Sequence, residues 1–217
     1  LQLFGTPSKV SFSSSTLMHN NSRLIFETYA QRYFKDAGRV LEIGPSDFPS
    51  PYCKLAEEGS NQWDTLDITD DDRLTYKGVD PYSFPIEDES YDLVFSAQVF
   101  EHVPKIWIWM KELARITRKG GRIITINPMS WPYHEHPQDC WRAYPDGMRA
   151  VSEDAGLEVI LSKCESIESR GFKKVVPGIG MEWQSKKRIM ISKMLAPLGF
   201  PIEAAFDTVT VAEKPTA

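Results

Sequence analysis

The chain has 217 residues, of which 41% are hydrophobic and 25% are charged, and its formal net charge is −5 at pH 7. This length and composition fit one globular domain that buries a sizeable core. The negative charge argues against a general nucleic-acid binder, which is usually basic, and no apolar run approaches the roughly 20 residues of a membrane span.

The cysteines and the first residues indicate the compartment. Cys53, Cys140 and Cys164 are odd in number and lack the C-x-x-C spacing, so they predict neither a disulfide framework nor a zinc site. The beginning of the chain is polar and serine-rich, without the apolar segment of a signal peptide. We therefore expect a cytoplasmic protein. Because the chain begins with leucine, we also expect it to be part of a larger multidomain protein.

The N-terminal part divides into a linker and a helix. Residues 1–18 predict a loose leader or linker, and residues 19–217 predict one domain. From Asn21 to Asp36 apolar and aromatic side chains recur at helical spacing. This predicted helix either covers a cofactor site or packs on the sheet.

The stretch from Arg39 to Phe48 organises the rest of the domain. A short β-favouring run leads into Gly44, and Ser50 and Pro51 then suit the N-cap and first turn of a helix over residues 52–58. A strand, a glycine turn and a helix N-terminus in this order are typical of an open α/β sheet that binds a nucleotide-like cofactor. A full dinucleotide fingerprint needs three glycines, and only Gly44 is present.

Strands and helices alternate along the remainder of the chain. Asp67 ends a second strand, close to the spacing of about 20 residues after the first turn at which an acid binds ribose hydroxyls. Further strands are predicted over residues 74–79, 91–96, 122–128, 156–161 and 206–212, and further helices over 105–118 and 145–155. This alternation predicts a doubly wound, mostly parallel α/β sheet.

These motifs together resemble the class I S-adenosylmethionine-dependent methyltransferases of type 11. The resemblance runs from about residue 39 to residue 128, and its pieces are the Val-Leu-Glu-Ile-Gly turn, Asp67, Asp80, the block from Pro85 to His102, and the segment from Leu113 to Pro128. It implies a Rossmann-like sheet of seven strands, whose last strand inserts antiparallel at the sheet edge.

The resemblance also implies a set of cofactor contacts for S-adenosylmethionine. Asp67 would bind the ribose, Ile68 would pack on the adenine, and Asp80 would accept a hydrogen bond from the adenine amino group. The methionine end and sulfonium would lie against Glu42, Gly44, Pro45, Ser46, Ser96, Ala97 and Gln98. Ser46 and Phe48 replace later glycines of the family, so the turn must be built differently. His102 is typical of the family, and we interpret it as structural rather than catalytic.

The segment from Met129 to Arg142 is the predicted site of chemistry. It follows a strand and contains His134, His136 and Asp139 among three aromatic residues. A histidine has a pKa suited to a general base near neutral pH, and we favour His136 with Asp139 as its orienting partner or as a second base. The alternative is that the loop only packs over the cofactor. The same three residues are compatible with a divalent metal, although spacing alone assigns none.

The acceptor is inferred from what the motifs contain and lack. Asn127-Pro128 is followed by Met129, so the signature of enzymes that methylate base amines is absent, and no Pro-Cys nucleophile motif occurs. We therefore expect no nucleic-acid substrate. The loop is similar to one in relatives associated with surface-polysaccharide building, which favours O-methylation of a sugar or glycan.

Three other functions stay open at the level of sequence. They are a methyltransferase of a quinone, lipid or secondary metabolite, a non-catalytic module that keeps the fold, and, least favoured, a nicotinamide dehydrogenase. Residues 166–205 predict a variable insertion on the substrate side that includes a basic amphipathic helix. This helix suits a substrate lid, a dimer surface, a contact to an anionic acceptor, or simply a solvated face.

Overall fold

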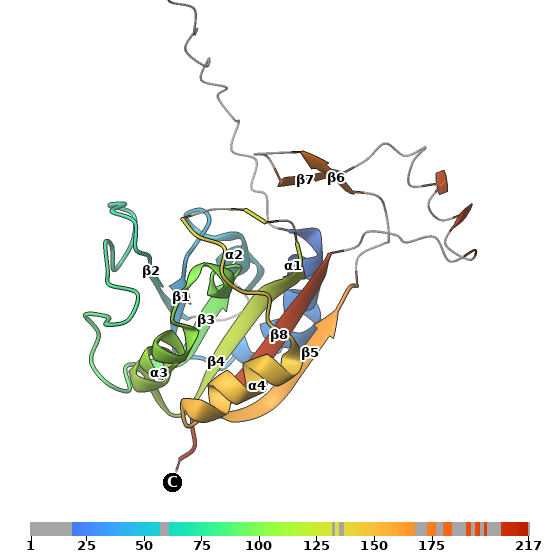
Figure 1. The fold of residues 1–217 in the computed structure, drawn as a ribbon. Helices are drawn as coiled ribbons and strands as arrows, with labels where there is room; N and C mark the ends of the chain where they lie inside the picture. Colours follow the sequence, from blue (N-terminus) through green and yellow to red (C-terminus); the bar gives the residue numbers. More distant parts are fainter. Residues whose placement is uncertain are drawn as a thin grey trace, which may run out of the picture.

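The domain is built on one twisted mixed sheet. The computed structural model describes residues 19–56, 61–131, 133–134, 137–167, 190–191, 194–195, 198 and 205–216, together with the backbone of 173–176 and 180–183. In these residues the main sheet has six strands in the order β2-β1-β3-β4-β8-β5 (Figure 1). The predicted Rossmann-like α/β fold is confirmed, with one strand fewer than expected.

The elements have the following bounds. The strands of the sheet are β1 (Arg39–Ile43), β2 (Gln62–Leu66), β3 (Tyr91–Ala97), β4 (Thr117–Ser130), β5 (Glu158–Glu165) and β8 (Phe206–Glu213). The helices are α1 (Asn20–Ile25), α2 (Pro51–Ala56), α3 (Ile106–Ile116) and α4 (Pro145–Asp154), with a 3-10 turn, η3, over Phe100–His102. A separate antiparallel pair consists of β6 (Lys173–Val176) and β7 (Gly180–Trp183).

Strand β3 lies near the middle of the parallel part of the sheet. It pairs in parallel with β1 on one side and with β4 on the other. Leu93, Val94 and Phe95 are all buried, because helices cover both faces of a parallel sheet. The near-continuous apolar sequence of this strand is therefore the pattern that its position requires.

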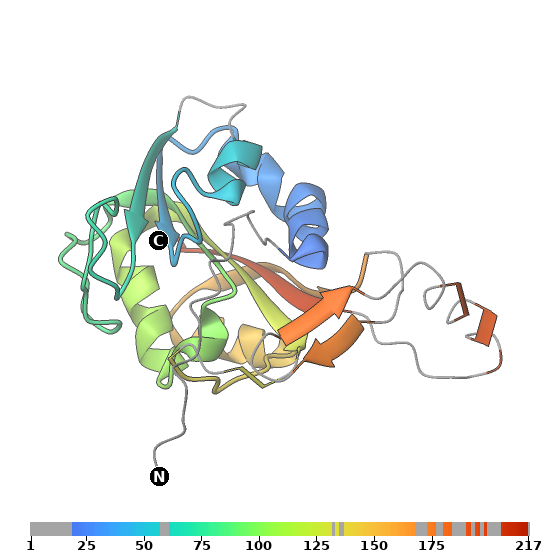
Figure 2. The same cartoon turned by 90° about the horizontal axis from the view of Figure 1, so that it is seen from above.

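The two faces of the sheet are covered by different helices. Helices α3 and α4 lie on one face, where Trp109, Leu113 and Met148 belong to one buried apolar cluster (Figure 2). Helices α1 and α2 lie on the other, where Phe26 and Tyr52 belong to a second cluster (Figure 2). The result is the three-layer arrangement of a doubly wound domain.

The N-terminal helix is less regular than its sequence pattern predicts. Residues 21–36 do not form one α-helix: α1 is followed by a π-helical segment, η1 (Phe26–Ala30), and a 3-10 segment, η2 (Gln31–Phe34). The Thr28 hydroxyl donates to the carbonyl of Leu24, at 2.7 Å. Such side-chain bonding to the preceding turn bends helices, and the bend fits this segment around the sheet.

The strand predicted over residues 74–79 is reduced to a single bridge between Leu66 and Tyr76. The side-chain hydroxyls of Thr65 and Thr75 accept hydrogen bonds from each other's backbone N–H at 3.1 Å, where ladder bonds would otherwise form. Gly78 then takes a positive φ of 59° and turns the chain away. Local side-chain bonding has replaced strand pairing here.

The last strand does not lie at the edge of the sheet. It is antiparallel, as expected, but it pairs with β4 on one side and with β5 on the other, so β5 forms the edge. Residues 207–212 are buried, which explains the apolar and threonine-rich sequence of β8. The prediction of an edge position was wrong, because pairing partners are decided by tertiary contacts.

Several other predictions fall partly or wholly outside the described residues. The leader over 1–18 does, as does most of the basic helix expected within 166–205, of which residues 190–191 and 194–195 are described and are helical. The backbone of 173–176 and 180–183 forms the β6–β7 pair. Helix α2 is described only as far as Ala56. No helix in the described part of the chain is long and apolar enough to cross a membrane.

Candidate active site

The carboxyl ends of β1, β2 and β3 meet at one edge of the sheet, and this edge carries the predicted cofactor residues. The sheet order places β1 between β2 and β3, so the chain reverses its direction of winding beside β1. Ligands of open α/β sheets bind at such a switch point. Gly44, Asp67 and Gln98 each follow directly or almost directly after one of these strands.

Gly44 is required by its position. Its φ is +69°, and a Cβ atom there would lie 2.4 Å from Cγ2 of Val99, which no real contact allows. The backbone N–H of Gly44 donates to the carbonyl of Leu66 at 2.9 Å. The turn is thereby fixed against β2, and its backbone borders the space beside the Asp67 carboxylate.

A cavity of about 540 Å³ opens at this edge. Four of the predicted cofactor residues line it, namely Gly44, Asp67, Ile68 and Gln98. The rest of its wall consists of Ile43, Leu66, Thr69, Pro81, Tyr82, Phe84, Val99, His102, Val103, Pro104, Trp109, Pro137 and Gln138. Its volume is in the range of pockets that bury small-molecule ligands and cofactors.

The chemistry of the wall fits S-adenosylmethionine. The Asp67 carboxylate is oriented by the backbone N–H of Thr69, which donates to Oδ1 at 2.8 Å. Ile68 exposes 49% of its surface although it is a large apolar residue. An oriented carboxylate beside an accessible aliphatic side chain suits a ribose and an adenine ring, respectively. Gly44 has no Cβ, so its backbone can closely approach a bound cofactor.

The other predicted cofactor residues lie outside this wall. These are Glu42, Pro45, Ser46, Asp80, Ser96 and Ala97. Asp80 accepts a hydrogen bond from the backbone N–H of Tyr82 at 2.7 Å, so it shapes the loop that provides Pro81 and Tyr82 to the cavity. Ser96 is buried within β3, and its hydroxyl has no hydrogen-bond partner among the described residues.

The buried carboxyl of Glu42 stabilises the turn between β1 and α2. Only 2% of its surface is exposed, and its Oε2 accepts hydrogen bonds from Ser50 Oγ at 2.6 Å and from Trp63 Nε1 at 2.9 Å. Ser50 Oγ in turn accepts from the N–H of Cys53 at 2.9 Å and caps α2. Burial raises the pKa of Glu42 to about 7, although both hydrogen bonds oppose the shift.

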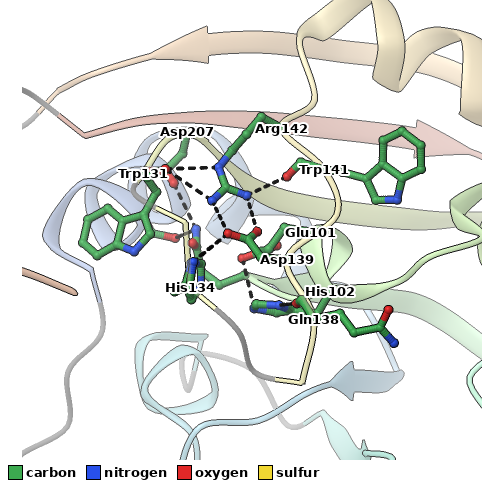
Figure 3. A network of polar contacts seen from close by, with 11 residues as sticks. Glu101, His102, Trp131, His134, Gln138, Asp139, Trp141, Arg142 and Asp207 are labelled. Carbon is green, nitrogen blue, oxygen red and sulfur yellow. Dashed lines mark hydrogen bonds and ion pairs between the residues drawn. The ribbon is translucent and has the colours of Figure 1, made fainter. Parts of the chain in front are cut away.

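The loop after β4 brings together two of its three predicted catalytic residues, while His136 lies outside the described residues. The side chain of Asp139 is 1% exposed, and its Oδ2 lies 3.3 Å from Nδ1 of His134. Arg142 donates to both oxygens of Asp139, with Nη2 2.7 Å from Oδ2 (Figure 3). Burial alone would raise the pKa of Asp139, but the bonds from Arg142 and the His134 backbone hold it below its ordinary value.

A second part of this site was not foreseen from the sequence. Glu101, in η3, is buried, and neither of its carboxylate oxygens has a hydrogen-bond partner among the described residues. Burial raises the pKa of Glu101 to about 8. The neighbouring His102 places Nε2 3.7 Å from Oε1 of Glu101, and its Nδ1 bonds to the carbonyl of Gln138 (Figure 3). Burial lowers the pKa of His102.

The loop and η3 are tied together by the backbone. The carbonyl of Glu101 accepts from the N–H of Cys140 at 2.7 Å, and Trp141 Nε1 donates to the carbonyl of Val103 at 3.0 Å. His102 and Gln138 line the cofactor cavity. The polar cluster of Glu101, His102, His134 and Asp139 therefore reaches the cavity wall through His102.

A further buried network lies beside Gln98. Its Nε2 donates to Oδ1 of Asp207 at 3.0 Å, and Nδ2 of Asn21 donates to Oδ2 at 2.6 Å. Ser22 and Tyr52 share a hydrogen bond at 2.8 Å between their hydroxyl groups. These contacts join α1, β3 and β8, so the N-terminal segment does close over this end of the sheet. The only sequence signal for this network was Asp207, an acidic residue near the start of the last strand.

The fold is the Rossmann-like fold of class I S-adenosylmethionine-dependent methyltransferases. Residues 28–125, somewhat less than half of the chain, match the family described as "Methyltransferase domain". The predicted enzyme class and cofactor are thereby confirmed.

Similar proteins agree with this class. The 27-O-demethylrifamycin SV methyltransferase of Amycolatopsis mediterranei is 34% identical over 125 residues, which cover 51% of this chain and 46% of that protein. A SAM-dependent methyltransferase from Archaeoglobus fulgidus superposes with a TM-score of 0.57 at 18% identity, covering 89% of this chain and 94% of that chain. Phosphoethanolamine N-methyltransferase 2 of Haemonchus contortus, in complex with S-adenosyl-L-methionine, has a TM-score of 0.56 at 14% identity, covering 91% and 53%. The matches span less than half of the length of the curated relatives.

Proposed function

We propose that this chain transfers the methyl group of S-adenosylmethionine to a hydroxyl group of a sugar or glycan acceptor. The observation that carries the proposal is that one cavity is lined both by Asp67 and, from η3 and the loop after β4, by His102 and Gln138. A cofactor held by Asp67 would thus have its reactive end near the cluster formed by Glu101, His102 and His134.

Methyl transfer to oxygen needs alignment and the loss of one proton. The hydroxyl oxygen must lie in line with the methyl–sulfur bond, and its proton must pass to a nearby base. Because burial lowers the pKa of His102, its imidazole is neutral at pH 7, and the Nδ1 bond to the Gln138 carbonyl leaves Nε2 as the proton acceptor. His134, oriented by Asp139, offers a second imidazole, and His136 stays a sequence-based candidate for the same role.

A saccharide suits the polar and aromatic character of the loop. Tyr133 is 72% exposed and Trp141 is 36% exposed, which is unusual for large aromatic residues. Aromatic faces stack on sugar rings, and the sequence resemblance of this loop favours the same acceptor. In this proposal Asp67 and Ile68 bind the nucleoside, and Arg142 holds the loop through Asp139.

A second acceptor class, a small secondary metabolite, has separate support. The relative from Amycolatopsis is named for methylation of an oxygen on such a compound. Phe84, Val103 and Trp109 give the cavity an apolar side that would suit it.

The test is a methylation assay with methyl-labelled S-adenosylmethionine. Free sugars, nucleotide-linked sugars and oligosaccharides form one panel, and quinols and polyketide-like hydroxyl compounds form another, with product mass as the readout. Label in the first panel supports the sugar proposal, and label confined to the second refutes it in favour of the metabolite.

The matched variants are Asp67→Ala and Asp70→Ala. Asp67 lines the cavity, whereas Asp70 is outside its wall and pairs with Lys77. We expect Asp67→Ala to weaken cofactor binding by about a hundredfold, since charge-assisted hydrogen bonds contribute roughly 1.5–3 kcal/mol each. Asp70→Ala should bind as the parent does. Unchanged binding in Asp67→Ala would refute the ribose assignment.

A further inference from the structure

Glu101 is an anomaly that the methyltransferase fold by itself does not explain. Its side chain is 1% exposed, and within the described residues neither oxygen has a hydrogen-bond partner. Buried carboxyl groups are normally satisfied by several donors or by a metal ion. In the described part of the chain, the ion-pair partner of this carboxyl is Nε2 of His102, at 3.7 Å.

Two imidazole rings are oriented beside this carboxyl. Nδ1 of His102 bonds to the carbonyl of Gln138, and Nδ1 of His134 lies 3.3 Å from Oδ2 of Asp139. The two rings are nearly perpendicular, with centroids 5.0 Å apart. Histidines that bind metals almost always have one ring nitrogen held in this way by a carbonyl or a carboxylate, which fixes the tautomer and orients the ring.

The spacing of the three groups suits one ion. One ligand atom from each of Glu101, His102 and His134 lies within 4.8 Å of the other two. Zinc binds nitrogen at about 2.0–2.1 Å, so its ligand atoms are about 3.4 Å apart. The 3.7 Å between Glu101 and His102 is already close to this value, and His134 needs to approach by up to about 1.4 Å. His134 is partly exposed, so an ion can enter from its side.

The local charge also favours a cation. The carboxylates of Asp139 and Asp207 lie within electrostatic range of Glu101, as does the guanidinium of Arg142, which pairs with Asp139. A pair of imidazoles with one carboxylate favours transition ions such as Zn²⁺ over Mg²⁺, which prefers oxygen ligands.

We propose that Glu101, His102 and His134 form a binding site for a divalent transition-metal ion of the zinc type. The sequence assigned no metal site and was only compatible with a different set, in which Asp139 was a ligand. In the structure the Asp139 carboxylate contacts Nδ1 of His134 and orients its ring. Because His102 lines the cofactor cavity, an ion bound by its ring would lie next to that cavity. With an ion bound, Nε2 of His102 is a ligand and no longer the proton acceptor, and the ion instead lowers the pKa of a coordinated hydroxyl. This role rests on the function proposed above.

The test measures metal binding without any acceptor, so its outcome does not depend on the proposed substrate. The untagged chain is stripped with a chelator and titrated with Zn²⁺ by calorimetry, and Co²⁺ is added separately so that visible absorption reports the coordination. We expect one ion per chain, with intense Co²⁺ bands typical of four ligands. Glu101→Gln and His102→Gln should each weaken Zn²⁺ binding by at least about fiftyfold, in the range known for loss of a key group at a metal site.

The control variant is Cys140→Ser. Cys140 is an exposed free cysteine in the same loop, so its removal tests whether zinc binds adventitiously to a thiol. We expect the affinity for Zn²⁺ to be unchanged in this variant. Folding of Glu101→Gln is checked by S-adenosylmethionine binding, which should persist because Glu101 is not part of the cavity wall.

Each contrary result refutes the site. Absence of Zn²⁺ and Co²⁺ binding to the parent would show that Glu101 is simply a buried neutral acid. Equal Zn²⁺ affinity in Glu101→Gln and the parent, or loss of binding in Cys140→Ser, would place the ion elsewhere. If Zn²⁺ binds as expected but no sugar is methylated, the metal site stands and only the proposed acceptor fails.

Discussion

The substitution Glu42→Gln should change how the stability of this protein depends on pH. Both hydrogen bonds to the buried carboxyl, from Ser50 and from Trp63, end on the same oxygen, Oε2. The amide oxygen of glutamine can accept both, so the substitution preserves the contacts and removes only the ionisable group. A difference between variant and parent that varies with pH therefore reports the titration of Glu42.

The size of the effect follows from the two pKa values. Burial raises the pKa of Glu42 from 4.5 to about 7 in the folded protein. The pKa of Glu42 is higher in the folded protein than in the unfolded chain. As the pH rises, the carboxyl therefore ionises first in the unfolded chain, and this ionisation favours unfolding. Its stabilising effect is complete below pH 4.5 and is lost as the pH rises towards 7. Between about pH 5 and about pH 8 the parent should lose about 2.5 kcal/mol at this site.

The assay is urea denaturation of parent and variant at about pH 5 and about pH 8, with unfolding followed by tryptophan fluorescence. The free energy of unfolding of Glu42→Gln relative to the parent should be higher by about 2.5 kcal/mol at the upper pH than at the lower. S-adenosylmethionine should bind both proteins equally, because Glu42 lies outside the cavity wall. A relative stability that does not vary with pH would refute the buried, pKa-shifted state. Loss of cofactor binding would show instead that Glu42 contacts the ligand.

Two more substitutions test the turn and the loop. Gly44→Ala should lower the affinity for S-adenosylmethionine by at least about tenfold, because the new Cβ would clash with Val99 at a positive φ. Gly78→Ala is the control for backbone strain alone, since a Cβ there meets nothing, and calorimetry should find its cofactor affinity unchanged. Arg142→Gln should lower the free energy of unfolding by about 3 kcal/mol in urea denaturation, because it leaves Asp139 buried without its cation. A loss below 1 kcal/mol would mean that solvent reaches Asp139.

The sequence by itself determined the framework and placed several predicted cofactor residues at one edge of the sheet. Glycine turns, N-caps and apolar runs are local patterns, so they located β1, β3, α3 and α4 to within a few residues. Asp67 and Gly44 were identified in the same way, because each ends a strand whose carboxyl end must reach the same edge of the sheet. The cytoplasmic location and the exclusion of nucleic acid stay predictions from composition.

Only the tertiary structure brought Glu101, His102 and His134 together beside the cavity. Glu101 and His102 meet His134 because backbone hydrogen bonds fasten the loop after β4 onto η3, and Asn21 meets Asp207 across the whole length of the chain. The position of β8 between β4 and β5 was likewise decided by the tertiary structure. Contacts of this kind close long loops and bury polar groups that no local periodicity records. For this reason His102 appeared structural in the sequence, whereas the structure places its ring in the wall of the cavity.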